Sequence, residues 1–71
     1  MERIPVISSD IASIGYDDAS SKLEIEFHSD NSIYQYYGVP KIEYDELMSA
    51  SSHGKYFHKN IKNRYRYEKI S

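Results

Sequence analysis

The chain has 71 residues, a formal net charge of −2 and no cysteine. This length allows one domain, and a domain of this size buries only about 60% of the surface that its unfolded chain exposes, which disfavours a deep catalytic pocket. Without cysteine it has neither a disulfide nor a thiolate metal site, so we expect a protein of the reducing cytoplasm. No stretch approaches the roughly 18 apolar residues of a membrane span, and residues 1–5 do not resemble a signal peptide; we expect no membrane partner.

The N-terminal half predicts an extended segment followed by three strands. Residues 1–10 are expected to be extended, because Pro5 disfavours helical angles in the residue before it. Three later segments alternate between apolar and polar side chains, the period of a strand with one buried face, at 11–16, 22–28 and 32–37. In 22–28 the apolar face has Leu23, Ile25 and Phe27, and the other face has Glu24 and Glu26. We expect that other face to meet water.

A two-residue turn at 30–31 is predicted to join the second and third strands, since Asp and Asn tolerate the positive φ of such a turn. This turn would set Phe27 opposite Tyr34 and Ile25 opposite Tyr36. The two tyrosines are then expected to be core residues rather than ligand-binding ones.

Two helices are predicted after the strands. Residues 40–50 place Tyr44, Leu47 and Met48 at helical spacing, and residues 55–63 place Phe57 and Ile61 on an inner face. Between them, 51–54 breaks the first helix and can cap the second. Residues 64–71 alternate again and are either a short strand or a tail.

Strands followed by helices indicate an α+β fold in one domain over residues 1–71. We expect a three-stranded antiparallel sheet, a meander, covered on one face by two C-terminal helices.

Charge is distributed unevenly along the chain. Residues 1–52 contain three basic and ten acidic side chains, whereas residues 53–71 contain six basic and one acidic. A basic segment on an acidic body indicates a surface for a polyanion. The alternative is a solvated helix face that keeps a small domain soluble.

Tyrosines among these bases fit single-stranded nucleic acid, because aromatic rings stack on unpaired bases while cations contact phosphates. The candidate nucleic-acid-binding residues are Lys55, Tyr56, Lys59, Lys62, Arg64, Tyr65 and Arg66. A packed or frayed terminus is the alternative interpretation of residues 64–67.

Catalytic and metal sites are not predicted. The spacing of His28, His53 and His58 does not match a zinc site, so we expect no metal and no other cofactor. Serines cluster in turns and caps, where hydrogen bonds to the backbone explain them. Glu24 and Glu26 share a strand face, and we interpret them as solubilising charges rather than a catalytic carboxylate pair. We expect a protein that is not an enzyme.

Several short motifs, by their order and spacing, resemble the KTSC domain, which is named for its occurrence at the C-terminus of some lysyl-tRNA synthetases. The motifs are Val6 with Ser8-Ser9, Ile14-Gly15-Tyr16-Asp17, Leu23-Glu24-Ile25-Glu26-Phe27, Ile33-Tyr34-Gln35-Tyr36, Gly38-Val39-Pro40, Tyr44, Leu47, Ser51, Gly54-Lys55-Tyr56-Phe57, Ile61 and Tyr65. The resemblance covers nearly the whole chain. It implies a domain that also occurs alone in small bacterial and phage proteins, with RNA binding as its suggested role and no catalytic residues.

The residues and the resemblance together predict a small, non-enzymatic binding or accessory domain whose basic C-terminal segment binds RNA or another nucleic acid. The alternative partner is a protein. In that case the chain is a protein-interaction or self-associating module that uses an exposed sheet face or an edge strand. A related alternative is that this module is encoded by a phage or mobile element.

Overall fold

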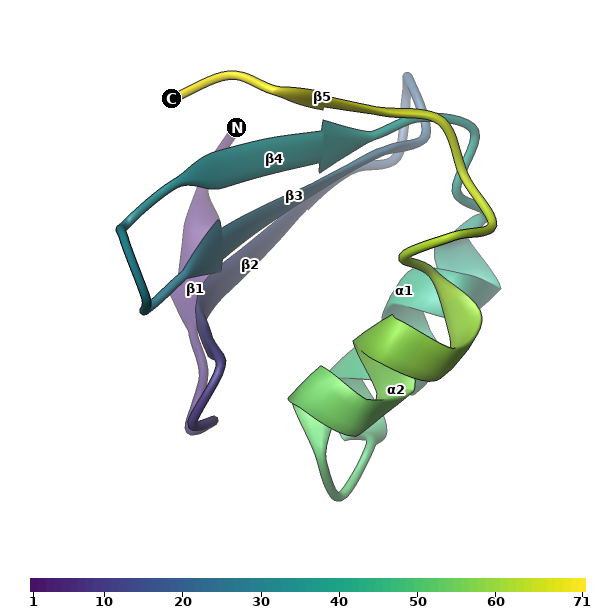
Figure 1. Cartoon of the computed structure of the whole chain (residues 1–71). Coiled ribbons are helices and arrows are strands. Elements are labelled where there is room, and N and C mark those ends of the chain that lie inside the picture. The colour runs from purple at the N-terminus through teal and green to yellow at the C-terminus, as the bar shows by residue number, and fades with distance from the viewer.

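The computed structural model describes residues 1–71 and contains five strands and two helices. The elements in chain order are β1 (Arg3–Pro5), β2 (Ile11–Asp17), β3 (Lys22–Phe27), β4 (Ile33–Tyr36), α1 (Lys41–Ser49), α2 (His53–Asn60) and β5 (Tyr67–Lys69). All strands join one antiparallel sheet in the order β1-β2-β3-β4-β5, and both helices lie to one side of it (Figure 1). Neither helix has the length and apolar character needed to cross a membrane.

The predicted α+β architecture with two helices on one sheet face is confirmed, but the prediction of three strands is wrong. Strand β1 extends the sheet beyond β2, with Ile4 opposite Ile14. Strand β5 extends it beyond β4, with Tyr67 opposite Tyr36. Each added strand has only three residues, too few for an alternating pattern to reveal. Of the two alternatives for the C-terminal segment, a short strand is therefore correct at 67–69.

The β3–β4 hairpin has the predicted buried face, but its predicted register is wrong by two residues. Ile25 lies opposite Tyr34, and Leu23 lies opposite Tyr36. A shift of two residues keeps every side chain on its own face, because side chains alternate with a period of two. Tyr36 is accordingly in the core, 3% exposed, and Tyr34 is half-buried.

The cause of the shift is a loop of four residues, 28–31, in place of the expected two. The backbone N–H of Phe27 donates to the carbonyl of Ser32 at 3.0 Å, which closes the loop. Within it, the Asp30 carboxylate accepts a hydrogen bond from the Ser32 N–H at 3.1 Å, and Asn31 has a φ of 57°. Asp and Asn thus perform the turn roles expected of them, in a longer loop.

The core fills the space between the sheet and the two helices. Its nine buried residues are Ile11, Ile14, Leu23, Ile25, Tyr36, Val39, Leu47, Phe57 and Ile61. The inner faces predicted for both helices are confirmed, since Leu47 of α1 and Phe57 of α2 are among them. Helix α2 begins where the Ser52 side chain accepts a hydrogen bond from the Lys55 N–H at 3.3 Å, so the predicted cap is also confirmed.

The expectation that the opposite sheet face meets water is wrong at its centre. Glu24 is 5% exposed and Ser13 is 7% exposed. The N-terminal residues cover this area because Gly15 has no side chain: a Cβ there would lie 2.8 Å from the carbonyl oxygen of Glu2. Glu24 is therefore a buried, hydrogen-bonded carboxylate rather than a solubilising surface charge.

Candidate nucleic-acid interface

The exposed side of α2 and of the turn that follows it presents three lysines. Lys55, Lys59 and Lys62 are all exposed; the spacing of four residues places Lys55 and Lys59 on the same side of α2, and Lys62 lies in the turn after it. None of the three takes part in an ion pair, whereas Arg3, Lys41 and Arg64 do. Their charges are therefore available to an external anion.

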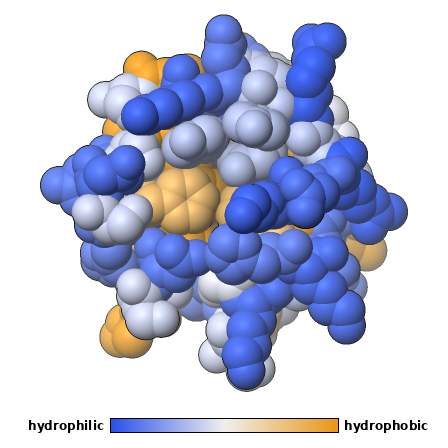
Figure 2. All heavy atoms as spheres, viewed as in Figure 1, coloured by the Kyte–Doolittle hydropathy of each residue, from blue (hydrophilic) through white to orange (hydrophobic).

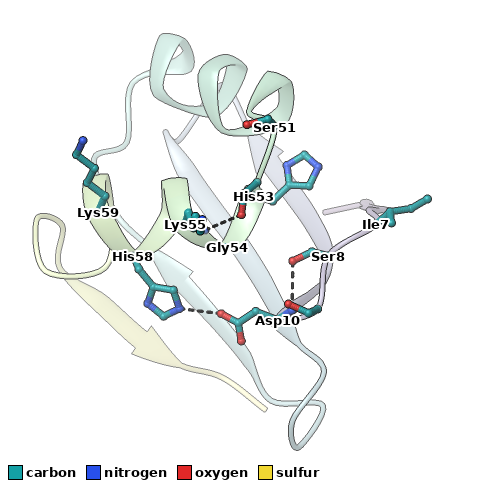
Figure 3. A pocket seen from close by; sticks show the side chains of 11 residues that line it. Ile7, Ser8, Asp10, Ser51, His53, Gly54, Lys55, His58 and Lys59 are labelled. Atoms are coloured by element: carbon teal, nitrogen blue, oxygen red, sulfur yellow. Dashed lines mark hydrogen bonds and ion pairs between the residues drawn. The ribbon is translucent and has the colours of Figure 1, made fainter.

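Lys55 and Lys59 line an open groove of about 960 Å³ between α2 and the loop before β2, which we call the lysine groove (Figure 3). Its opposite wall is formed by Ser8, Ser9 and Asp10. The two walls approach closely at Gly54, where a Cβ would lie 3.4 Å from the Cβ of Asp10.

Two histidines of α2 also line the lysine groove. His58 Nε2 lies 2.7 Å from Asp10 Oδ2, in the contact visible in Figure 3, and His53 Nδ1 lies 2.9 Å from the carbonyl oxygen of Leu47. The contacts of the two rings are thus with a backbone carbonyl and a carboxylate. The arrangement suits binding through charge and hydrogen bonds.

Three other candidate residues converge on Glu43 of α1, which is 9% exposed. Tyr65 donates its hydroxyl proton to Glu43 Oε2 at 2.9 Å, and Tyr56 donates to Glu43 and to Glu46. Arg64 Nη1 lies 3.7 Å from Glu43 Oε2. Burial, together with these carboxylates, raises the pKa of Tyr56 and of Tyr65. The two hydroxyls are therefore occupied within the protein, where they tie α1 to α2 and to the following turn.

Arg66, the last candidate, lies apart from the others. Its guanidinium carbon is 5.9 Å from the centre of the Tyr37 ring. Tyr37 in turn donates to Glu68 at 2.8 Å and lies 3.5 Å from Gln35, on the sheet face opposite the helices. The structure thus brings Lys55 and Lys59 together in the lysine groove, groups Tyr56, Arg64 and Tyr65 around an acid, and separates Arg66 from both sets.

A second cavity was not predicted from the sequence. This aromatic hollow, about 300 Å³ in volume, lies between the sheet and the end of α2 and is lined by Phe27, Tyr34, Tyr36, Phe57 and Tyr67. It shares Asp10 and His58 with the lysine groove. Lys62 lies on its rim. Its rings come from β3, β4, α2 and β5, so no single segment of the sequence signals it.

The two helices on one five-stranded antiparallel sheet define a small α+β domain. The KTSC domain family model matches residues 7–65, and the chain belongs to that family. The predicted resemblance is confirmed, and the family is not a catalytic one.

Several relatives place this domain in two contexts. The chain is 43% identical over 56 residues to a lysine–tRNA ligase of Trichormus variabilis, a match that covers 79% of this chain and 10% of the ligase. It is 38% identical to an uncharacterized protein of Stutzerimonas stutzeri, with 99% of each chain covered. The crystal structure of a KTSC domain protein from Yersinia pestis superimposes with a TM-score of 0.94 at 44% identity, covering 99% of this chain and 97% of that one. The chain therefore spans about a tenth of the ligase and nearly the full length of the two smaller relatives.

Proposed function

We propose that this KTSC domain is a non-enzymatic accessory domain of the cytoplasm that binds single-stranded RNA. The observation that carries the proposal is the set of three exposed lysines without ion-pair partners, Lys55, Lys59 and Lys62, on and after α2. Lysines so placed bind phosphates as point charges and release counterions from the nucleic acid when they do.

The surroundings of these lysines support an extended anionic ligand. The lysine groove is open and polar, and its acidic group, Asp10, is hydrogen-bonded to His58 at 2.7 Å. A backbone that crosses the groove can contact Lys55 and Lys59 and reach Lys62 at the rim of the aromatic hollow. Arg64 is a weaker candidate for a phosphate contact, because Glu43 lies 3.7 Å from it.

The relatives support the same ligand class. A lysine–tRNA ligase acts, by its name, on a tRNA, and the matching region makes up a tenth of that enzyme. An accessory domain that holds RNA would serve such an enzyme, and it would also act on its own in the relatives of this length.

The experiment compares two double variants with equal changes in net charge. In the first, Lys55→Gln and Lys59→Gln remove the charges of the lysine groove; in the control, Lys22→Gln and Lys41→Gln remove two charges elsewhere. Fluorescence anisotropy with labelled single-stranded RNA and tRNA, measured over a range of salt, gives the slope of log affinity against log salt. Each phosphate contact contributes about 0.7 to that slope for single strands.

We expect the wild type to lose affinity steeply with salt, the first variant to have a slope lower by about 1.4, and the control to match the wild type. If the wild type binds neither RNA even at low salt, the RNA proposal fails. Equal losses in the two variants would indicate a non-specific effect of charge and would also contradict it.

A protein partner is the second candidate, favoured by the two free sheet edges. Strands β1 and β5 are each paired on one side only, so their outer backbone groups can accept an added strand. Sedimentation over a range of concentrations tests self-association. A protein that binds no RNA and forms dimers would favour this alternative.

A further inference from the structure

Five aromatic rings surround the hollow between the sheet and α2 in a closed circuit. Neighbouring centroids are 5.3–5.8 Å apart in the order Phe27, Tyr34, Tyr67, Tyr36, Phe57 and back to Phe27. None of these pairs is stacked: the angles between ring planes run from 34° to 83°. By contrast, Tyr16 and Tyr44 stack at 4.8 Å and 12° elsewhere in the molecule. The five rings thus meet edge to face or at a tilt rather than face to face.

The aromatic hollow is open to an external ligand. Tyr36 and Phe57 are 3% and 1% exposed and form its floor, whereas Tyr67 at the rim is 56% exposed. Figure 2 shows an apolar ring at the bottom of a depression surrounded by hydrophilic atoms. A volume of about 300 Å³ is at the small end of the range for ligand sites, which fits one flat ring system rather than a large ligand.

Three tyrosine hydroxyls are gathered at the hollow. Burial, and the neighbouring phenol groups of Tyr34 and Tyr67, raise the pKa of Tyr36, which keeps its hydroxyl protonated. Unlike Tyr16, Tyr37, Tyr56 and Tyr65, the three tyrosines of the hollow donate to no protein group. Their hydroxyls are free to hydrogen-bond the polar edge of a ligand.

The charges around the hollow differ from side to side. Lys62 and Asn63 lie on the α2 side, which continues past His58 and the Asp10 carboxylate hydrogen-bonded to it into the lysine groove. Asp30 lies on the hairpin side, where its carboxylate accepts from the Ser32 N–H. An acid on that side repels phosphate and can accept hydrogen bonds from amino groups, so a nucleotide would place its phosphate toward Lys62 and its base inward.

We propose that the aromatic hollow binds one unpaired nucleobase of the single-stranded RNA whose phosphates contact the α2 lysines. This inference rests on the proposed function, and it adds that the domain binds a base of the RNA as well as its phosphates. Stacking on protein rings is tolerant of sequence, because every base has an aromatic face. The site therefore discriminates strongly between unpaired and paired RNA and only weakly among the four bases.

The experiment compares a short single-stranded RNA with an abasic strand that keeps the same sugars and phosphates. Binding of both is measured by fluorescence anisotropy for the wild type, for Tyr67→Leu and for a control, Tyr37→Leu, which removes a tyrosine from the opposite sheet face. Thermal unfolding confirms that each variant is folded. The affinities of the wild type for the two strands can be compared even if a variant does not fold.

We expect the wild type to bind the RNA at least about fivefold more tightly than the abasic strand, since one stacked base contributes about 1–3 kcal/mol. Tyr67→Leu should reduce this ratio to within about threefold without weakening the binding of the abasic strand. Tyr37→Leu should keep the wild-type ratio.

Three results would overturn the inference. If the wild type binds both strands equally and in a salt-dependent way, the hollow does not hold a base, while the proposed RNA function stands. If the ratio survives in Tyr67→Leu or is lost in Tyr37→Leu, the base is read elsewhere. If neither strand binds at low salt, the proposed function itself fails, and this inference fails with it.

Discussion

The carboxylate of Glu24 joins three strands on the sheet face opposite the helices. Arg3 of β1 donates to one of its oxygens, and Gln35 of β4 donates to the other at 2.9 Å. Burial opposes the charged form, but the hydrogen bonds from Gln35 and Arg3 outweigh it and hold the pKa of Glu24 below its ordinary value of 4.5. Arg3 also donates to Ser13 of β2 at 3.0 Å. The buried centre of this face is therefore held by charge-assisted hydrogen bonds.

We expect Glu24→Gln to lower the free energy of unfolding by about 1–3 kcal/mol at neutral pH, because it leaves Arg3 without its charged partner. A lowered folded-state pKa means that the charged form stabilises the fold above the unfolded pKa, near 4.5, and that this contribution is lost as the pH falls through the folded-state pKa. The variant should therefore lose less stability than the wild type on acidification below about 4.5. Urea unfolding at a series of pH values measures both effects.

Glu26→Gln is the matched control for this change. Glu26 lies on the same face of β3 and accepts a hydrogen bond from Ser13 at 2.8 Å, but it has no cationic partner. We expect a smaller loss of stability and little change in the response to acid. An equal effect of the two substitutions would show that the Arg3 pair is not what stabilises this face.

At the scale of elements, the start of α2 depends on one side chain. Ser52 accepts a hydrogen bond from the Lys55 N–H at 3.3 Å, which satisfies a backbone donor that the helix leaves free. Ser52→Ala should lower the free energy of unfolding by about 1 kcal/mol, and the melting temperature by roughly 4–8 °C for a domain of this size. Thermal unfolding followed by circular dichroism measures the shift.

Ser51→Ala is the control for Ser52→Ala, since Ser51 is an exposed neighbour that does not cap the helix. Its melting temperature should stay close to that of the wild type. If the two variants melt together, the cap of α2 contributes nothing measurable and the helix is fixed by the packing of Phe57 and Ile61 alone.

The elements also show what a sequence can and cannot predict. The alternation of residues 22–28 and the helical spacing of Phe57 and Ile61 are local patterns, and both predict the buried faces correctly. The hairpin register was missed because four loop residues replace two while every side chain keeps its face. Strands β1 and β5 form because they pair with β2 and β4. Each has only three residues, which is too short for an alternating pattern to predict a strand from the sequence.

The same distinction applies to the candidate site. The spacing of Lys55, Lys59 and Lys62 predicts a shared basic side, and the structure places all three at the adjoining cavities. The contacts of Glu43 with Arg64 and Tyr65 could not be predicted from local sequence patterns, because 21 or more residues separate Glu43 from them. The aromatic hollow is likewise a product of tertiary packing.

At the scale of the whole molecule, the basic segment of the sequence does not form one basic surface. The chain turns after α2, and β5 returns along β4, so that Tyr37 donates its backbone N–H to the carbonyl of Arg66 at 2.8 Å. Arg66 is thereby placed over Tyr37 on the sheet face opposite α2, while Lys59 stays in the lysine groove. Two residues of like charge and close sequence position thus belong to different faces.

This separation predicts different effects of the same loss of charge. Lys59→Gln should weaken binding of single-stranded RNA about fivefold at low salt, corresponding to ~1 kcal/mol, and should lower the salt slope by about 0.7. Arg66→Gln should leave the affinity within about twofold, because a charge on the opposite face acts only through a screened, long-range field. Anisotropy titrations under identical salt conditions compare the two. If Arg66→Gln weakens binding as much as Lys59→Gln does, the RNA must wrap around the sheet edge at β5, and the interface is larger than the α2 side of the molecule.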